Sequence, residues 1–482
     1  MQNKIYILQD CDVDGLISSV LVYKYLIHLG VKHENIVVLY HEDKRHGLNE
    51  DIMKEIKNDC KLLWIPDANP SSQQYVEDLK NKNIKIIQTD HHEIPPYDGV
   101  FSINNQYSDK VTNKSLSGAG VTYKFIKYCC EQNNDLYHQD LLDLVALSNV
   151  ADVMDMKNLE NRYYNFIGFS NIKNSFLSFL INELSKGIVT PTTLAWDVVP
   201  KLNAVIRSDN FELKKEIFEC FIGISEEYAS VLKKVKREKN NQNKNVQLLL
   251  DSCEIEQYKN FILAYVQPSN YTGLLASKIM SKYEKPTFCL YKKNNNYNGS
   301  CRSTRDIKTF CNNSNLINFA EGHQKSFGIS IPENNIDNFI KYLDTDISYE
   351  DEPTEVCCIY NKNNIPDNLF GYWDKYASLW GKNLNEPIFY IENIEISVKD
   401  IAVLGRNKST LKWNINHIDF IYFFADQKLK EKLYNGESDK VILNIVGKLK
   451  INDWNNNKIK QVVIDKIEIK KYNKYNSWKE LF

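Results

Sequence analysis

The sequence lacks any apolar run long enough to cross a lipid bilayer, and its first residues lead directly into an expected strand at 5–8. We therefore expect neither a signal peptide nor a membrane anchor, and no membrane partner. None of the eleven cysteines belongs to a CxxC pair, which argues against a zinc site and against a disulfide framework. Free thiols are typical of a reducing compartment, so we expect a cytoplasmic protein.

The chain also has little net charge, because 60 Lys and Arg oppose 62 Asp and Glu. This balance does not exclude a nucleic-acid enzyme, since such a protein can be neutral overall and basic only along its groove. With 482 residues, 43% of them hydrophobic, the chain has the composition of a globular protein too long for one core. Two to four domains are expected.

The stretch Asp10–Gly15 reads Asp-Cys-Asp-Val-Asp-Gly and separates the expected strand at 5–8 from a helical pattern. Its three carboxylates occupy alternate positions, so they point the same way if the turn is extended. Converging acids repel one another unless a cation lies among them, and Mg²⁺ or Mn²⁺ suits an oxygen-rich site. The alternative is a solvated acidic turn. Cys11 is not expected to be a nucleophile, because the neighbouring carboxylates raise the pKa of its thiol.

Further acids follow later apolar segments. Asp67 comes after an expected strand at 62–65, and open α/β sheets bind ligands at the carboxyl ends of their strands. A lone Asp before a helix is more often an N-cap, but the metal role is favoured here. Asp152 ends an apolar segment, where burial of a carboxylate is costly without a cation or strong hydrogen bonds.

The triplet Asp90-His91-His92 follows an apolar run at 84–87. Adjacent side chains of an extended segment point to opposite sides, so we expect one imidazole to bind metal and the other to face substrate. Residues 117–120 read Ser-Gly-Ala-Gly and open a helix. Such small residues permit a helix N-terminus to approach an anion or another backbone closely, or they form a tight packing turn; both interpretations stay open.

Beyond residue 210 the pattern changes. A long helical stretch carries a basic run at 233–239, which is either a solvated face or the flank of a nucleic-acid channel. A second α/β unit follows, with a strand expected at 247–250. Short strands at 388–396, 409–414, 418–424, 441–451 and 458–469 favour a small barrel of the OB type. Trp413, Phe423 and Trp454 are candidates for base stacking, although aromatics in strands more often lie in the core.

Several of these stretches resemble the DHH phosphoesterase superfamily and, within it, the RecJ single-strand-specific exonucleases. The DxDxDG turn and the Asp-His-His triplet carry the resemblance first. Residues 145–153 (VALSNVADV) are similar to the family's VALxxxADV segment, and 199–207 (VPKLNAVIR) to its PRLNAxGR segment. In the latter, Lys201 and Ile206 replace the usual Arg and Gly.

The second half of the chain adds to the resemblance. Residues 299–303 (GSCRS) and 322–323 (GH) are similar to the GSxRS and GGH motifs of DHHA1 domains, with Glu321 replacing a Gly. The turn at 380–387 is similar to the family's FGxGNPEP turn. The resemblance implies an α/β fold with a parallel-sheet DHH domain (1–210), a long helical linker (211–245), an α/β DHHA1 domain (246–348), and a connector plus OB-like β-barrel (349–482).

The resemblance also implies two divalent cations, Mn²⁺ or Mg²⁺. Asp12 and Asp67 would hold one, with Asp10 nearby. The other would be held by Asp14, Asp67, His91 and Asp152, which makes Asp67 the bridge. His92 would contact the scissile phosphate, and Asp90 would hold the metal-binding residues in place without binding a metal itself. The residues that would bind the substrate are Asn203, Arg207, Ser300, Arg302, Ser303 and His323.

The expected activity is two-metal hydrolysis of single-stranded DNA, 5′→3′, releasing 5′-mononucleotides in DNA recombination, repair or replication. Strand polarity and the preference for DNA come from the resemblance alone. One alternative is a DHH phosphodiesterase for short oligonucleotides or cyclic dinucleotides. Another is a non-catalytic replication scaffold on the same fold. The sequence leaves open whether a single-strand-binding protein or a helicase recruits the enzyme.

Overall fold

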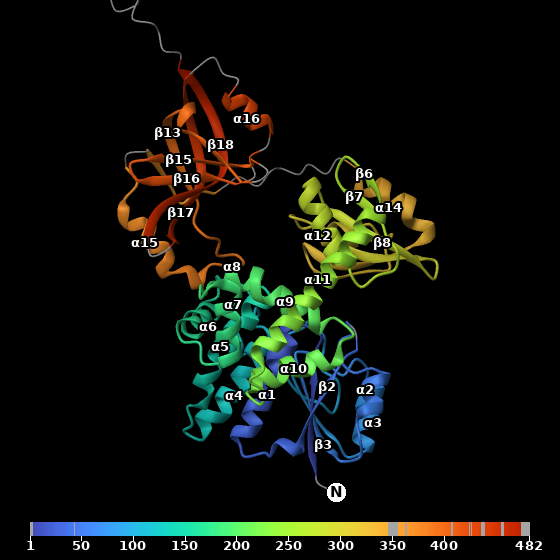
Figure 1. Cartoon of the computed structure of the whole chain (residues 1–482). Coiled ribbons are helices and arrows are strands. Elements are labelled where there is room, and N and C mark those ends of the chain that lie inside the picture. Colours follow the sequence, from blue (N-terminus) through green and yellow to red (C-terminus); the bar gives the residue numbers. More distant parts are fainter. Residues whose placement is uncertain are drawn as a thin grey trace, which may run out of the picture.

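The computed structural model describes residues 3–42, 44–345, 355–361, 364–405, 408–423, 425, 427–434, 439–454 and 457–473. Among these residues, no helix is both long and apolar enough to span a bilayer. The N-terminal domain lies at the base of Figure 1, with two further sheets side by side above it.

The N-terminal domain is built on a five-stranded, all-parallel sheet of order β2-β1-β3-β4-β5. Its strands are β1 (Lys4–Gln9), β2 (Ile36–Tyr40), β3 (Cys60–Pro66), β4 (Lys85–Asp90) and β5 (Phe101–Asn104). One face packs against α1 (Val13–His28) and α4 (Gly118–Gln132), and the other against α2 (Glu50–Glu55) and α3 (Gln73–Asn81). The parallel sheet with helices on both faces is confirmed, and it aligns the carboxyl ends of β1, β3 and β4 at one edge.

A group of helices extends the α1–α4 layer. It comprises α5 (Leu142–Ala151), α6 (Leu159–Ser170), α7 (Ser175–Ser185), α8 (Pro191–Thr193), the π-helical turn η3 (Leu194–Val198), α9 (Val199–Ile206) and α10 (Phe211–Ile222). The helices α5 and α6 cross closely at Gly168, where an added Cβ would lie 2.3 Å from the Leu142 carbonyl oxygen. The contact fixes α5, which carries Asp152 at its end.

The helix α11 (Tyr228–Ser252) connects this group to the second sheet. The strand expected at 247–250 is wrong, because these residues form the last turns of α11. Val246 is buried at helical spacing from Gln242, and Leu249 and Leu250 pack against the second domain. An apolar run of this length satisfies a helix face as well as a strand, and the tertiary contact decides between them.

The second domain contains a six-stranded mixed sheet of order β10-β11-β9-β8-β7-β6. Its elements are β6 (Glu254–Gln257), β7 (Ile262–Tyr265), α12 (Thr272–Tyr283), β8 (Thr287–Lys293), β9 (Asn296–Arg302), α13 (Lys308–Asn313), β10 (Phe319–His323), β11 (Ser326–Pro332) and α14 (Ile336–Leu343).

The C-terminal domain contains a seven-stranded sheet of order β12-β13-β17-β18-β16-β15-β14. Its elements are β12 (Cys358–Asn361), α15 (Asp367–Lys375), β13 (Phe389–Ser397), β14 (Ala402–Leu404), β15 (Thr410–Ile415), β16 (Ile418–Tyr422), α16 (Gln427–Tyr434), β17 (Lys440–Trp454) and β18 (Asn457–Asn473). The five predicted strands are confirmed as β13, β15, β16, β17 and β18.

The candidate stacking aromatics of this domain differ in their exposure to solvent. Trp413 is 2% exposed and stacks on Phe420 inside the sheet's core, so for this candidate the alternative of a core aromatic is confirmed and base stacking is excluded. Phe423 is 46% exposed. The side chain of Trp454 lies outside the described residues.

Candidate metal centre

The acidic turn is fixed by the junction between β1 and α1. Asp12 is the N-cap of α1, and its carboxylate accepts a hydrogen bond from the Gly15 amide at 3.2 Å. A Cβ on Gly15 would lie 2.5 Å from the Cβ of Asp10, so only glycine permits the chain to turn this tightly. Asp10, at the end of β1, and Asp14, in the first turn of α1, are both buried.

The N-terminus of α4 holds Asp14. Its two carboxylate oxygens accept hydrogen bonds from the Gly118 amide at 2.7 Å and the Ala119 amide at 2.9 Å. Ser148 of α5 donates its hydroxyl to the same carboxylate. Of the open interpretations of residues 117–120, the approach of a helix N-terminus to an anion is the one confirmed, and the anion belongs to the protein itself.

Asp67 lies at the end of β3 with φ of +59°, a left-handed conformation that places its carboxylate over α4. A Cβ on Gly118 would lie 2.2 Å from Asp67 Oδ1, so the two elements are as close as glycine allows. Oδ1 is buried and makes no hydrogen bond with any described residue. The same holds for Oδ2 of Asp152, which caps the C-terminus of α5.

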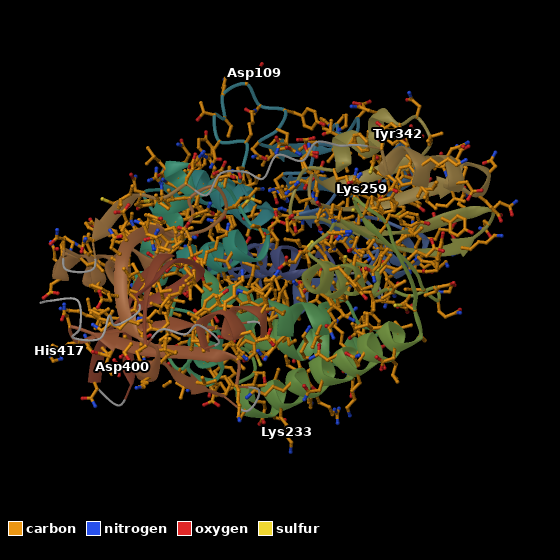
Figure 2. The ribbon with its side chains drawn as sticks, turned by 90° about the horizontal axis from the view of Figure 1, so that it is seen from above. Asp109, Lys233, Lys259, Tyr342, Asp400 and His417 are labelled. Carbon is orange, nitrogen blue, oxygen red and sulfur yellow. The ribbon has the colours of Figure 1, made fainter. Side chains whose placement is uncertain are left out.

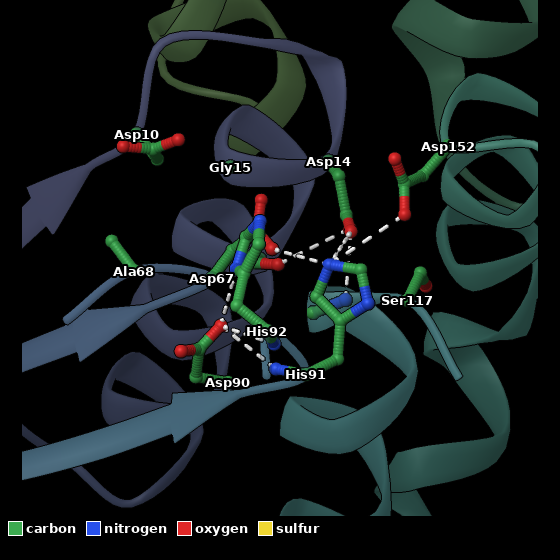
Figure 3. Close-up of polar contacts among 12 residues, drawn as sticks. Asp10, Asp14, Gly15, Asp67, Ala68, Asp90, His91, His92, Ser117 and Asp152 are labelled. Carbon is green, nitrogen blue, oxygen red and sulfur yellow. Dashed lines mark hydrogen bonds and ion pairs between the residues drawn. The ribbon is translucent and has the colours of Figure 1, made fainter. Parts of the chain in front are cut away.

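His91 brings these acids together, as Figure 3 shows. Its Nε2 lies 3.3 Å from Asp67 Oδ1, 3.5 Å from Asp152 Oδ2 and 3.8 Å from Asp14 Oδ2. Buried carboxylate oxygens without a hydrogen-bond donor cost free energy, so their convergence on one imidazole marks a site that favours a cation.

Asp90 supports both histidines. One of its carboxylate oxygens accepts from His92 Nδ1 at 2.7 Å and from the His91 amide at 2.7 Å, and Gln88 donates to the other at 3.1 Å. The expectation that His91 and His92 point to opposite sides is wrong, because their ring centroids are 4.5 Å apart. The strand ends at Asp90, and the bend that follows abolishes the alternation of a strand.

The electrostatics of the cluster also indicate missing positive charge. Burial, followed by repulsion from the neighbouring acids, raises the pKa of Asp67 well above its usual value, and the pKa of Asp152 rises for the same reasons. Burial raises the pKa of Asp14 and lowers that of His91. Burial lowers the pKa of His92, but the hydrogen bond from His92 to Asp90 outweighs it and raises this pKa to about 9.

The donor atoms form compact groups, each small enough to hold one ion. Asp10, Asp12 and Asp67 form one, and Asp14, His91 and Asp152 form another; within each, the ligand atoms lie within 4.8 Å of one another. Carboxylate oxygens with a single imidazole fit a hard divalent cation such as Mg²⁺ or Mn²⁺. The structure therefore brings all six predicted metal ligands together.

The sequence reasoning missed His46, which lies in the loop after β2. Its Nδ1 is 2.6 Å from Asp10 Oδ2, and this hydrogen bond raises the pKa of His46 to about 11. The Sγ of Cys11 lies 3.5 Å from His46 Nε2, and burial raises the pKa of that thiol. No spacing in the sequence connects a loop histidine with an acid 36 residues earlier.

The predicted substrate residues of the N-terminal domain lie beside the centre. Asn203 of α9 accepts a hydrogen bond from the Val13 amide at 3.2 Å. Arg207 caps the same helix, and its Nη2 is 3.5 Å from Asp12 Oδ2. Both residues therefore contact the acidic turn directly.

Residues of the second domain also lie near the acidic turn. Lys44 donates to the Asn270 carbonyl across the two domains, and its pKa is lowered to about 8 by burial and then by the nearby Arg207 and Arg302. Ser300 Oγ is 2.9 Å from Thr272 Oγ1, and Ser303 accepts from the Arg305 amide at 3.0 Å. Of His323, only its place in β10 is described, and its side chain lies outside the described residues.

Comparison with known proteins agrees with this geometry. Residues 4–148 match the DHH family, N-terminal domain, and residues 373–466 match the RecJ OB domain. A protein provisionally named as the SPbeta prophage-derived single-strand DNA-specific exonuclease YorK of Bacillus subtilis (strain 168) is 29% identical; the match covers 97% of this chain and 88% of that protein. The single-stranded-DNA-specific exonuclease RecJ of Haemophilus influenzae is 26% identical, with the same coverage of 97% and 88%.

Solved structures match the fold as well. The crystal structure of RecJ in complex with Mn²⁺ from Thermus thermophilus has a TM-score of 0.73 at 17% identity, covering 98% of this chain and 70% of that one. These matches confirm the predicted fold class. The chain therefore carries a region that matches the DHH family, N-terminal domain, and a region that matches the RecJ OB domain, and over nearly its whole length it is similar to proteins named single-strand DNA-specific exonucleases.

Proposed function

We propose that this protein is an exonuclease that hydrolyses single-stranded DNA in the 5′→3′ direction with two divalent cations, Mn²⁺ or Mg²⁺. The observation that carries the proposal is the convergence of buried acids on His91, with Oδ1 of Asp67 and Oδ2 of Asp152 left without hydrogen bonds among the described residues. The relatives named as single-strand DNA-specific exonucleases support the choice of substrate.

The proposed ligand sets extend the two compact groups of donor atoms. Asp12 and Asp67 would hold one ion, with Asp10 nearby. Asp14, His91 and Asp152 would hold the other, and Asp67, whose Oδ1 lies 3.3 Å from His91 Nε2, is proposed as a ligand of both ions. When bound, the two ions supply an activated water and neutralise charge on the phosphoryl group. The amides of Gly118 and Ala119 hold both oxygens of the Asp14 carboxylate and fix its orientation toward the other ligands.

His92 is proposed to act on the scissile phosphate. The hydrogen bond from Nδ1 to Asp90 fixes the ring and raises the pKa of His92 against the effect of burial, which favours a ring with a proton on both nitrogens. Nε2 is then free to donate a hydrogen bond to a phosphate oxygen, which stabilises the charge that develops during hydrolysis. Its imidazole is 44% exposed, as a contact with substrate requires.

Three cations beside the centre are proposed to bind the terminal phosphate of the strand. Lys44, Arg207 and Arg302 come from both domains, and the pKa of Arg302 is lowered by burial and by Arg207, which places positive charges close together. A cluster of like charges is unfavourable unless it receives an anion. Ser300, Ser303 and His323 are proposed to complete the grip on the nucleotide, and Asn203 to hold the acidic turn.

The domain boundaries are proposed as the DHH domain to residue 210, a helical linker, a DHHA1-type domain to residue 348, and the OB domain. The 5′→3′ polarity is proposed from the resemblance to the RecJ exonucleases alone. The free state of all described cysteines fits a reducing cytoplasm. Recruitment by a single-strand-binding protein or a helicase is a separate proposal without a surface assigned to it.

The test is digestion of a long single strand, a hairpin and a dinucleotide with Mn²⁺ by the native chain, by Asp67→Ala and by Glu77→Gln, a matched control on the exposed face of α3. We expect the native chain and the control to degrade the long strand from its 5′ end, and Asp67→Ala to lose at least about 10²-fold in rate. Preference for the dinucleotide would favour the short-oligonucleotide phosphodiesterase. Absence of both Mn²⁺ binding and hydrolysis in the native chain would favour a scaffold.

A further inference from the structure

One face of α11 carries four cations without a partner among the described residues. Lys233, Lys236, Arg237 and Lys244 are all exposed, and none makes an ion pair or hydrogen bond with any residue that the structure describes. Other cations of the same helix are paired: Lys234 lies 2.5 Å from Glu216, and Lys239 donates to Gln242 at 2.6 Å. The unpaired charges therefore gather on one face.

These four side chains line a groove of about 590 Å³, together with Ser230, Lys234, Asn240 and Asn241. Lys233 lies at the periphery of the molecule in Figure 2, on the ribbon of α11. From Lys233 to Lys244 the helix rises by roughly 16 Å, enough to face several phosphates of an extended strand. Like charges three or four residues apart on a helix destabilise it, so an anionic partner would relieve a cost that the free protein bears.

The positive surface extends beyond α11 to both neighbouring domains. Burial lowers the pKa of Lys239, and so do Lys201 of α9 and Lys278 of α12, which places these cations close together. Lys201 donates to the Asp197 carbonyl at 2.5 Å, and the adjacent Trp196 is 76% exposed. Single-stranded nucleic acids are bound by positively charged grooves that follow the backbone, so cations from three helices lying close together suit such a ligand.

We propose that the α11 groove, lined by Lys233, Lys236, Arg237 and Lys244, binds the sugar–phosphate backbone of the substrate strand away from its cut end. The proposal rests on the proposed function for the identity of the polyanion. The helix α9 links the two sites: its Asn203 and Arg207 contact the acidic turn, and its Lys201 lies on the α11 side. A strand held at both places would stay bound while its end is cut.

The test uses the variant K233A/K236A/R237A/K244A. Its control, K57A/K61A/K82A/K85A, removes the same charge from exposed lysines at the opposite end of the parallel sheet. Binding of a 30-nucleotide single strand is measured in an Asp67→Ala background, so that no hydrolysis interferes. We expect the α11 variant to lose at least about 10-fold in affinity at roughly 0.1 M salt, and its log–log salt slope to fall by about 2–3, since each phosphate contact on a single strand contributes about 0.7. The control should change neither quantity.

Hydrolysis of a dinucleotide by the α11 variant with Asp67 intact should fall less than hydrolysis of the 30-nucleotide strand, because a shorter substrate meets less of the groove. If the α11 variant loses binding but the native chain shows no nuclease activity, the proposed function is wrong, while the proposal that the groove binds single strands stands. Equal affinities and slopes for the two quadruple variants would overturn the proposal. So would α11-dependent binding to phosphatidylserine vesicles with undiminished binding to the single strand.

Discussion

Gly118 sets how closely α4 approaches the acids, and its replacement by alanine should disable the metal centre while leaving the fold intact. The new Cβ would lie 2.2 Å from Asp67 Oδ1, whereas ordinary contact begins at about 3.4 Å, so the carboxylate must retreat by roughly 1 Å. A displacement of about 1 Å at a reacting centre costs on the order of 10²-fold in rate. We therefore expect Gly118→Ala to lose about 10²-fold in kcat on single-stranded DNA and to bind Mn²⁺ more weakly.

Gly120→Ala is the matched control, because its Cβ would meet nothing closer than 3.4 Å in the same helix turn. Overpacking at residue 118 should lower the free energy of unfolding by about 1–3 kcal/mol, and the higher helix propensity of alanine should raise it by up to about 1 kcal/mol. Thermal unfolding of Gly118→Ala should therefore stay cooperative, with a modestly lower midpoint. Isothermal titration with Mn²⁺ and single-turnover digestion compare the two variants. If Gly118→Ala binds Mn²⁺ and cuts DNA as Gly120→Ala does, Asp67 is not held in place by its contact with α4.

The other predictions concern charge and packing around the same centre. In EDTA, Asp67→Asn should raise the midpoint of thermal unfolding, because the raised pKa of buried Asp67 means that its negative charge destabilises the fold at neutral pH. This destabilisation should disappear as the pH falls and Asp67 takes up a proton. The same variant should not be stabilised by Mn²⁺, whereas the native chain should gain about 2.7 kcal/mol at a Mn²⁺ concentration of one hundred times Kd. The affinity for a 5′-phosphorylated strand should fall as the pH rises through about 8, where Lys44 loses its proton, and Lys44→Arg should abolish this step in a pH series. Gly168→Ala should destabilise the chain by about 1–3 kcal/mol in urea unfolding, since its Cβ would lie 2.3 Å from the Leu142 carbonyl.

The positions of the acids could be predicted because each follows a buried element. Asp12 and Asp67 come directly after apolar strands, and the edge of a parallel sheet gathers whatever follows its strands. Their partners could not be predicted in the same way. Two of the donors to Asp14 are the backbone amides of Gly118 and Ala119, more than a hundred residues later, and amides carry no side-chain signal.

The periodicity of the sequence also gave wrong predictions where the local pattern favoured one structure and the tertiary contacts another. Residues 247–250 have the composition of a strand, yet they continue α11 because Leu249 and Leu250 pack on the second domain. The alternation expected for His91 and His92 failed for a related reason, since it holds only while the chain remains in β4. In the C-terminal sheet the strands were predicted but the parallel pairing of β16 with β18 was not, because pairing depends on contacts far apart in sequence.

The loop after Asp152 explains why the C-terminal domain bears on the metal centre. Val153 has φ of +54°, which is strained for a β-branched residue and persists only when both sides of the loop are fixed. On one side α5 holds Asp152; on the other, Asn383 donates to Asp155 at 2.8 Å and the Met156 amide donates to the Lys382 carbonyl at 2.9 Å. The C-terminal domain is thus joined to the chain three residues beyond a proposed metal ligand. The loop that follows Asp152 is therefore held on its far side by residues 382 and 383, so substitutions there should affect the position of Asp152.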